Sequence, residues 1–431
     1  MNHSQTSEKI LIKNGHIIDP ENDINDVLDI LIDDGKIQQI GQIELDQHHS
    51  SITQTIDAKN LIVLPGLVDL RARFREPGQE YKATIASESK AAAKSGITSI
   101  CIAPDTDPVI DRPSIANTIT EKSHAANGAK SYPLSALTKG LQGNMIGDLW
   151  SLAETGCIGT SNAKRPISSV LVQRRAMQYA ASFDITIHLY PQDHELLGNG
   201  CVHEGITSTR LGLPAVPTAA ELVGLARDIA LVESTNVSAH FMGISCARSV
   251  EMILAAQKRG LNITADVDIH HLLMCEDDMK DFDSAYHIEP PLRTKADQMA
   301  LIEGLKSGII SSICSDHQPH DPDAKLAPFG ETESGISSLE FFLPALFKLN
   351  DCFNIDFDTL LKAMTINPAR IAGISAGELS IGSAADCIIV DPNAEWTFQT
   401  SDILSQGKNT PYLGQSVKGR CLHTIIDGRL I

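Results

Sequence analysis

One stretch of the chain decides its fold, and it reads Leu61-Ile62-Val63-Leu64-Pro65-Gly66-Leu67-Val68-Asp69-Leu70-Arg71-Ala72-Arg73. Its apolar part predicts a buried β-strand. The hydrophobic pattern changes at this stretch, from short alternating strands before it to apolar runs that alternate with helix-like segments after it. Successive side chains of a strand point to opposite faces, so Arg71 and Arg73 are expected on the same side. Because a buried charge needs a partner, the two arginines predict a carboxylate nearby.

Short apolar runs alternate with helix-like segments over about 300 residues after this stretch, which is typical of a parallel sheet in an α/β protein. The strand-like runs lie at 99–103, 185–189, 237–241, 262–267 and 309–316, and the helix-like segments include 83–95, 219–233, 249–259 and 359–371. Strand–helix alternation of this length favours a closed (β/α)8 barrel of the TIM type.

The two ends of the chain have a different rhythm from the middle. Residues 10–64 read as short strands separated by turn residues, as in a small antiparallel sheet, and β rhythm returns at 385–391 and 424–428. The simplest arrangement joins both ends in one small β-sandwich domain that the barrel interrupts. We therefore predict that residues 1–64 and 376–431 form the two parts of the sandwich and that residues 65–375 form the barrel.

Composition excludes several classes of protein. The 431 residues are 42% hydrophobic and 21% charged, and the formal net charge of −19 argues against nucleic acid or an anionic membrane as a partner. The nine cysteines contain no C-x-x-C pair and are expected to be reduced thiols. Residues 1–9 are polar, unlike a signal peptide, and no apolar run approaches the roughly 20 residues of a membrane span. We expect a cytoplasmic protein.

The order of motifs along the chain resembles that of type I dihydroorotases, from about residue 10 to residue 431. In that family a strand carrying His-x-His stands just before Arg-Glu-Pro-Gly and binds metal. The matching segments here are 64–69, 75–82, 103–109, 290–294, 315–320, 365–370 and 382–386. The resemblance implies the barrel and sandwich described above. It also implies a family whose enzymes use zinc to open or close a cyclic amide in pyrimidine biosynthesis.

The resemblance also identifies the positions that hold zinc in the family, and five of the six carry other residues. These positions are Arg71 and Arg73 for the two histidines, Asn162 for an aspartate, Tyr190 and Gly243 for two further histidines, and Asp316, which is retained. His188 lies two residues before Tyr190, so a shifted register would return a histidine to that position. A catalytic zinc site needs at least three protein ligands. We therefore expect no metal, no zinc-dependent hydrolysis, and Asp316 as a vestige of the family's last ligand and proton shuttle.

The first and last strands of a closed eight-stranded barrel are neighbours, so Asp316 should face Arg71 and Arg73. The hypothesis is an Arg–Asp cluster that fills the space zinc would occupy; the alternative is a new anion-binding site. The adjacent pair His270-His271 is expected on a strand, where the two rings would point to opposite faces and could not chelate one metal together.

Recognition of substrate is partly changed as well, according to the same resemblance. Arg75 matches the family's arginine that grips the substrate carboxylate, and His320 matches a residue of the substrate-side loop. Asp105 stands where the family has asparagine, and a carboxylate there repels an anionic substrate. We interpret these three residues as vestiges of a substrate site.

A catalytically inactive, dihydroorotase-like chain that assembles with aspartate transcarbamoylase occurs in some bacteria, and this sequence looks like that group. The matching segments are 286–294, 317–320 and 323–329. The resemblance implies a pseudoenzyme that acts as a non-catalytic scaffold for the transcarbamoylase catalytic subunit, as a homodimer or in a larger hetero-oligomer. The alternative is an active cyclic-amide hydrolase of the dihydroorotase type with a remodelled, metal-poor site.

Overall fold

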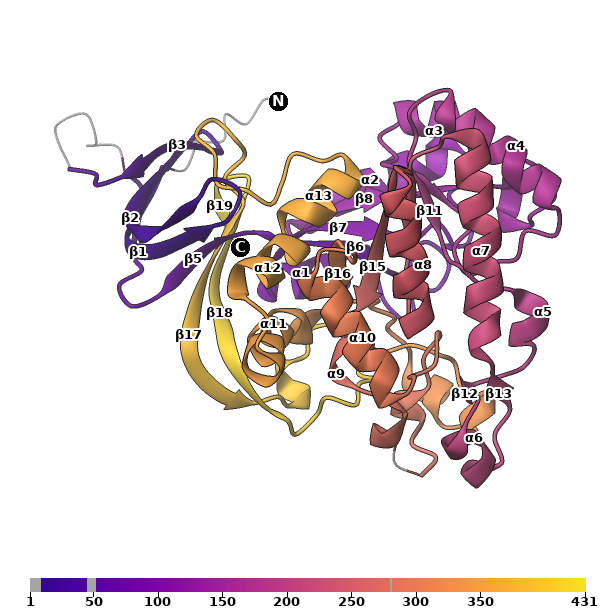
Figure 1. Ribbon diagram of the computed structural model, residues 1–431. Coiled ribbons are helices and arrows are strands. Elements are labelled where there is room, and N and C mark those ends of the chain that lie inside the picture. Colours follow the sequence, from indigo (N-terminus) through magenta and orange to yellow (C-terminus); the bar gives the residue numbers. More distant parts are fainter. Residues whose placement is uncertain (1–8, 45–51, 280) are drawn as a thin grey trace.

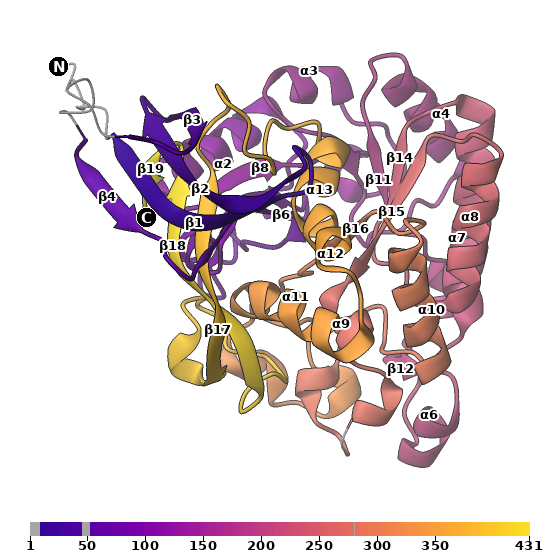
Figure 2. The same ribbon diagram turned by 60° about the vertical axis from the view of Figure 1, so that its left-hand side comes forward.

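The computed structural model describes residues 9–44, 52–279 and 281–431 and has a barrel of eight parallel strands (Figures 1 and 2). The strands are β6 (Leu67–Ala72), β7 (Ile97–Ile102), β8 (Lys130–Pro133) with β9 (Ser135–Ala136), β10 (Thr160–Ser161), β11 (Ile187–Leu189), β14 (Ala239–Phe241), β15 (Ile263–Asp268) and β16 (Ser312–Cys314). We count β8 and β9 as one barrel strand because only Leu134 separates them. A parallel bridge between Ala72 and His317 closes the barrel. The predicted (β/α)8 barrel is confirmed.

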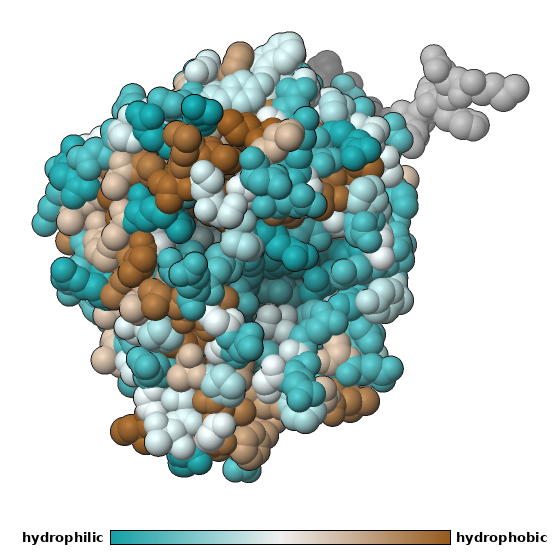
Figure 3. Space-filling view, turned by 90° about the vertical axis from the view of Figure 1, so that its right-hand side faces the viewer, coloured by the Kyte–Doolittle hydropathy of each residue, from teal (hydrophilic) through white to brown (hydrophobic). Residues whose placement is uncertain are grey.

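The helices that follow the strands pack around the barrel and share one large apolar core with it. They are α1 (Ile85–Lys94), α2 (Pro113–Ala126), α3 (Leu149–Glu154), α4 (Val170–Ala181), α7 (Thr218–Thr235), α8 (Ala247–Lys258), α10 (Lys295–Lys306), α11 (Leu339–Phe353), α12 (Phe357–Met364) and α13 (Ile366–Ala372). The side that carries α4, α5 and α7 is hollowed, and the walls of the hollow are mainly hydrophilic (Figure 3). No helix among the described residues is long and apolar enough to cross a membrane.

The single helix expected at 359–371 is wrong, because the chain forms α12 and α13 there with a break at Thr365. The backbone of Thr365 is not helical (φ −133°, ψ −92°). Pro368 supplies the reason: in a continuous helix its ring would clash with the carbonyl of Met364, four residues earlier, and its missing N–H would leave that carbonyl unpaired.

Long connections lie at the carboxyl ends of the barrel strands, the edge at which barrels of this type carry their sites. They hold α5 (His194–Leu197), β12 (Val202–His203), α6 (Ile206–Leu211), β13 (Ala215–Val216) and α9 (Ile269–Leu273). Strands β12 and β13 pair with each other in a sheet of two strands, separate from the barrel.

Both ends of the chain join in one sheet, as the predicted composite β domain requires. Its N-terminal strands are β1 (Ile10–Asp19), β2 (Ile24–Asp33), β3 (Lys36–Gly41), β4 (Gln54–Asp57) and β5 (Ile62–Pro65), and its C-terminal strands are β17 (Cys387–Thr397), β18 (Ser416–Ile426) and β19 (Arg429–Leu430). Strand β17 pairs antiparallel with β5. Ile12 and Ile30 from one end share a core with Ile389 and Ile425 from the other. The expectation about the polar N-terminus falls largely on residues 1–8, which lie outside the described residues.

The decisive stretch passes from this sheet to the barrel within a single residue, Gly66. Strand β5 ends at Pro65 and β6 begins at Leu67, and the Gly66 N–H donates to the carbonyl of Asp386 (2.9 Å). A Cβ at this position would lie 2.1 Å from the hydroxyl oxygen of Thr98 on β7. Only glycine lets the chain pass this close to β7 as it leaves the composite sheet. Strand β6 then runs through the barrel, and Arg71 and Arg73 lie at its end, at the mouth of the barrel.

Candidate functional site

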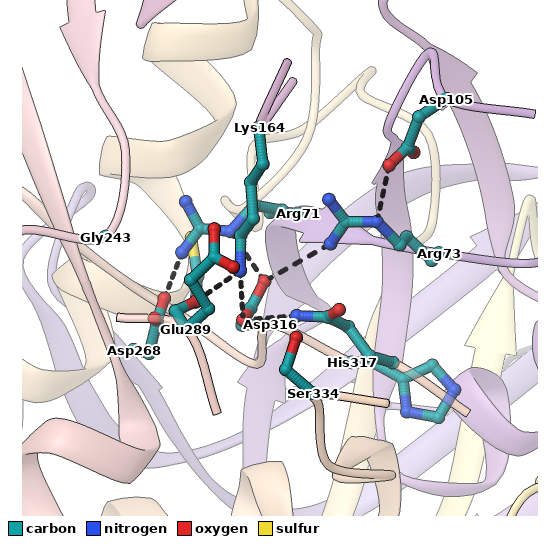
Figure 4. A network of polar contacts seen from close by, with 12 residues as sticks. Arg71, Arg73, Asp105, Lys164, Gly243, Asp268, Glu289, Asp316, His317 and Ser334 are labelled. Carbon is teal, nitrogen blue, oxygen red and sulfur yellow. Dashed lines mark hydrogen bonds and ion pairs between the residues drawn. The ribbon is translucent and has the colours of Figure 1, made fainter. Parts of the chain in front are cut away.

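The guanidinium of Arg71 lies at the barrel mouth and contacts three aspartates. Figure 4 shows two of them, Asp268 and Asp316. Its Nε donates to Oδ1 of Asp316 (3.0 Å), and its Nη2 lies 3.3 Å from Oδ1 of Asp266 and also contacts Asp268. The Arg71 side chain is 3% exposed. The predicted contact between the arginine pair and Asp316 is therefore confirmed, and two further carboxylates complete what we call the Arg71 cage (Arg71, Asp266, Asp268 and Asp316).

The charges of the cage stabilise one another. Burial alone would raise the pKa of Asp266, but the charge of Arg71 and the hydrogen bonds from its neighbours lower it to about 2. Burial likewise opposes ionisation of Asp268 and Asp316, and nearby cations still hold both pKa values below the usual range: Arg71 for Asp268, and Lys164 with Arg71 for Asp316. Burial alone would lower the pKa of Arg71, but the three aspartates raise it well above its usual value. The cage is a network of charged groups.

Asp266 and Asp268 come from the end of β15, where the strand period of two turns both to the barrel interior. Asp266 is held by His240, whose Nε2 lies 2.9 Å from Oδ2, and by the N–H of Gly243 (2.5 Å). Sequence reasoning missed both aspartates. A signal was present, because Asp266 lies in the strand-like run at 262–267 and Asp268 follows it two residues later, the spacing that puts two carboxylates on one face of a strand.

Arg73 pairs with Asp105, so two residues that differ from the family pattern compensate for each other. Nε of Arg73 donates to Oδ2 of Asp105 (2.8 Å), and Nη1 lies 3.7 Å from Oδ1 of Asp316. Burial alone would raise the pKa of Asp105, but Arg73 holds it below the usual range. The expectation that Asp105 repels an anion therefore needs correction, because the charge of Arg73 offsets that of Asp105.

Lys164 is a further cation at the mouth, beside Arg71 and Arg73, and sequence reasoning missed it. Its Nζ donates to the carbonyl of Glu289 and lies 3.7 Å from Oδ2 of Asp316 (Figure 4). The same Nζ lies 5.1 Å from the centre of the Tyr190 ring. Lysine two residues after Asn162 was the available signal, since a short strand ends there.

The replaced ligand positions do not all meet. Tyr190 lies beside Lys164, and its buried hydroxyl has no hydrogen-bond partner among the described residues. Asn162 instead joins its own loop to the loop after β9, donating to the Arg165 carbonyl (3.0 Å) and accepting from the Thr138 hydroxyl (2.6 Å). Asn162 and Tyr190 both line a cavity of about 490 Å3 beside the mouth.

His188 lies on β11, two residues before Tyr190, and its ring centre is 5.3 Å from that of His240. Neither of its ring nitrogens has a hydrogen-bond partner in the described part of the chain. Burial lowers its pKa to about 3, so the ring is neutral at ordinary pH.

Gly243 leaves room for the guanidinium of Arg71. Its backbone has φ +59°, and a Cβ built there would lie 3.2 Å from Nη2 of Arg71 and 3.4 Å from Oδ2 of Asp268. The family has a histidine at this position. Here glycine has no side chain, and the guanidinium of Arg71 lies against its backbone. Arg71 and Gly243 fit together as a pair.

Arg75 and His320 lie together at the rim of the mouth. Nε of Arg75 donates to the carbonyl of Pro319 (3.0 Å), and its Nη2 lies 3.2 Å from Nε2 of His320. Burial and the neighbouring Arg73 lower the pKa of Arg75 to about 10. Of the three residues predicted as vestiges of a substrate site, Arg75 and His320 therefore lie together, whereas Asp105 is paired with Arg73.

The expectation that His270 and His271 lie on a strand is wrong, because they lie in the short helix α9 that follows β15. Nδ1 of His270 lies 2.7 Å from the hydroxyl of Tyr412, and Nε2 of His271 lies 3.3 Å from the carbonyl of Pro291. Strand β15 ends at Asp268 and the chain turns into a helix directly after it, so the strand does not continue to the histidine pair.

The residues present do not fit the zinc that the family uses. Of the six ligand positions only Asp316 carries one of the side chains that usually bind zinc (Cys, His, Asp or Glu), and its two oxygens contact Arg71 (3.0 Å) and Gln318 (2.7 Å). Within residues 9–44, 52–279 and 281–431, no three His, Cys, Asp or Glu side chains are grouped so that they could hold a metal ion. In place of a set of metal ligands, the mouth holds a network of ion pairs centred on the guanidinium of Arg71.

Comparison with known proteins agrees with the fold and the order of motifs. Residues 62–431 match the amidohydrolase family. A dihydroorotase-like protein of Pseudomonas aeruginosa is 41% identical over 421 residues, covering 98% of this chain and 99% of its own. A dihydroorotase of Syntrophotalea carbinolica is 37% identical over 422 residues, covering 98% of both chains.

The structural comparison adds the fold alone. An L-hydantoinase (dihydropyrimidinase) from Arthrobacter aurescens superimposes with a TM-score of 0.84 at 20% identity, covering 98% of this chain and 96% of its own. With full-length relatives above 30% identity and a family match over most of the sequence, this chain belongs to the amidohydrolase family and is of the dihydroorotase type.

Proposed function

We propose that this chain is a catalytically inactive dihydroorotase homologue that serves pyrimidine biosynthesis as a non-catalytic subunit, supporting assembly or activity of aspartate transcarbamoylase. The observation that carries the first half of this proposal is the Arg71 cage. A guanidinium with three buried carboxylates occupies the mouth where the family's zinc chemistry takes place.

The chemistry of the cage supports loss of hydrolysis. Zinc in this family polarises the ring carbonyl and supplies a hydroxide at neutral pH, and Arg71 and Arg73 repel a divalent cation at short range. Asp316 would have to accept a proton, yet the pKa of this carboxyl is lowered despite burial by Lys164, Arg71 and Arg73. A carboxylate that is so strongly stabilised in its charged form is a poor general base.

The scaffold role is proposed from the preserved fold together with the resemblance to the transcarbamoylase-associated group. The whole length of the chain aligns with relatives at 41% identity that are named dihydroorotase-like proteins. A chain that retains its core and both parts of its composite sheet, while its ligand set has changed, fits selection for its surfaces. We further propose a homodimer or a larger hetero-oligomer in the cytoplasm.

The first experiment tests the loss of metal chemistry. Metal content and dihydroorotate turnover are measured on the purified chain, with the Syntrophotalea carbinolica dihydroorotase purified in parallel as the positive control. We expect zinc far below one ion per chain and turnover at the level of the buffer blank, also after incubation with zinc. Stoichiometric zinc with turnover would instead favour a hydrolase with a remodelled site.

The second experiment tests the partner. The chain is co-expressed with the aspartate transcarbamoylase catalytic subunit of the same organism, and size-exclusion chromatography with light scattering gives the mass of the complex. We expect co-elution, and higher transcarbamoylase activity with the chain than without it. If neither mass nor activity depends on the chain, the scaffold proposal is wrong.

A further inference from the structure

Aromatic side chains gather on the outer surface of the barrel, where α3 and α4 lie side by side (Figures 1 and 2). Trp150 of α3 and Phe183, which follows α4, are each 47% exposed, and their ring centres lie 6.3 Å apart. Tyr179 of α4 packs edge-on against Phe183, with ring centres 5.4 Å apart. Exposed tryptophan and tyrosine are typical of the surfaces that carry most of the binding energy between proteins.

The apolar surface reappears at the other end of α4. The side of the helix that carries Gln173 and Met177 is buried in the barrel, so the opposite side points outward. At its start Val170 is 51% exposed and Leu171 is 54% exposed. Single exposed apolar residues need no explanation, but a group of them marks an interaction surface. We call this surface the α4 face, and its apolar members are Trp150, Val170, Leu171, Tyr179 and Phe183.

The two ends of the α4 face carry opposite charges. Arg174 and Arg175 are exposed in the first half of α4, and Asp184 is exposed directly after Phe183. Glu154, at the end of α3, is exposed as well. None of these four charged residues forms an ion pair within the part of the chain that the structure describes. The face therefore offers unpaired cations at one end and unpaired carboxylates at the other.

A surface with this pattern is complementary to itself. When two α4 helices run antiparallel about a two-fold axis beside Tyr179, position 174 of one copy lies about level with position 184 of the other, because both are five residues from Tyr179. Arg174 then faces the carboxylate of Asp184, and Arg175 faces the ring of Phe183 in a cation–π arrangement. A two-fold axis makes each of these contacts twice.

We propose that the α4 face binds a second copy of this chain, with the two α4 helices antiparallel about a two-fold axis beside Tyr179. The inference rests on the homodimer of the proposed function and names its surface. The pattern of charges favours a second copy over a different protein, because symmetry supplies the complementary charges and rings without any further requirement on the partner.

The first test measures the mass of the purified chain, without transcarbamoylase, by size-exclusion chromatography with light scattering. We expect the unchanged protein to have the mass of two chains of 46.5 kDa each. Trp150→Ser combined with Phe183→Ser should give a single chain, with the dissociation constant of the dimer raised at least about a hundredfold, because each ring is lost on both sides of the axis. Circular dichroism verifies that the fold is kept.

The chain offers a matched control in two other exposed apolar residues. Ile206 is 85% exposed and Leu326 is 78% exposed, and both lie outside the α4 face. Ile206→Ser combined with Leu326→Ser should remain a dimer. The proposal is overturned if the unchanged chain is a single chain, if the variant of the α4 face stays a dimer, or if the control variant separates equally.

The second test examines the antiparallel arrangement. Gln178 is exposed and next to Tyr179, so a cysteine there lies close to its counterpart across the axis. In a background of Cys352→Ser, which removes the exposed cysteine of the chain, Gln178→Cys should form a disulfide-linked dimer under oxidation, seen on a non-reducing gel. Met299→Cys, on α10, should not. Absence of the linked dimer, or equal linkage by the α10 cysteine, would contradict the arrangement.

Co-expression of the α4-face variant with the transcarbamoylase catalytic subunit separates this inference from the scaffold proposal. We expect the variant still to co-elute with transcarbamoylase, because the α4 face is assigned to the second copy. If the variant loses transcarbamoylase while the chain alone keeps the mass of a dimer, the face binds transcarbamoylase and the inference is wrong. If the unchanged chain forms the dimer but never binds transcarbamoylase, the scaffold proposal fails and the dimer surface stands.

Discussion

The guanidinium of Arg71 has partners from two different strands, and this explains how a buried cation is tolerated. Asp266 and Asp268 come from β15, and Asp316 follows β16. Removing one partner from a buried ion network lowers the stability of the fold by more than the whole network adds to it, because the remaining charges stay buried and unpaired. Arg71 therefore has a structural role in addition to any effect on metal binding.

Arg71→Met tests this role. The methionine leaves three buried aspartates without their shared cation, and we expect a loss of about 3–5 kcal/mol in the free energy of unfolding. Arg71→Lys keeps the charge but loses the planar fork of donors, so its loss should be smaller. Urea unfolding at pH 7 measures both. Equal stability of Arg71→Met and the unchanged protein would show that the cage contributes nothing to folding.

At this scale the sequence predicted part of the cluster. The contact of Arg71 with Asp316 followed from strand period and barrel closure, two rules that need no side-chain detail. Asp266 and Lys164 each had a sequence signal, but their contacts in this cluster depend on how far the Arg71 and Lys164 side chains reach across the mouth, which strand period and barrel closure do not give. The pairing of Arg73 with Asp105 was missed for the same reason.

The end of strand β14 shows how an element is shaped to its neighbour. The strand stops at Phe241, and Gly243 turns the chain with a positive φ beside the guanidinium of Arg71. An L-residue with a side chain rarely adopts this conformation, and here its Cβ would also press on Arg71. The loop after β14 and the side chain at the end of β6 therefore depend on each other.

Gly243→Ala separates these two effects with the help of a matched glycine. Gly260 also has positive φ (+83°), but nothing lies within 4 Å of a Cβ built there. We expect Gly260→Ala to lose about 1 kcal/mol from backbone strain alone and Gly243→Ala to lose about 1–3 kcal/mol more, because overpacking adds to that strain. Urea unfolding gives both values. Equal losses would mean that Gly243 serves only the turn.

Elements with a clear period were predictable, and those decided by local exceptions were not. The strand-like runs at 99–103 and 262–267 became β7 and β15, because buried parallel strands require continuous apolar residues. The break between α12 and α13 depends on one proline, Pro368. The helix at His270 depends on where β15 ends, which apolar pattern alone does not fix.

The whole molecule is tied together by contacts between the barrel and the composite sheet. Nζ of Lys130 on β8 binds the carboxylates of Asp386 and Asp427 from the C-terminal part. Gly66 joins the layers at the N-terminal side. Because β17 lies between β18 and β5, the two ends of the chain must fold together. We infer that the barrel and the sheet unfold as one unit.

Four histidines distributed through this unit make its stability depend on pH. Burial lowers the pKa of His188 to about 3, of His270 and His287 to about 4, and of His320 to about 2. In the unfolded chain each titrates near 6.5, so below that pH the unfolded state binds more protons and is favoured. The stability is complete above pH 6.5 and is lost as the pH falls towards 4, by about 1.4 kcal/mol per pH unit for each histidine once the pH is below 6.

Urea unfolding between pH 7.5 and 5 measures this slope, and His188→Leu isolates one part of it. Asp69 opposes the histidines, because burial raises the pKa of this carboxyl to about 6 and the folded state then takes up its proton first. The ring nitrogens of His188 have no hydrogen-bond partner among the described residues, so leucine removes a titrating group without leaving a donor or acceptor behind. We expect His188→Leu to match the unchanged protein or exceed it at pH 7 and to exceed it clearly at pH 5. Parallel pH profiles of the two proteins would mean that His188 is not held neutral by burial.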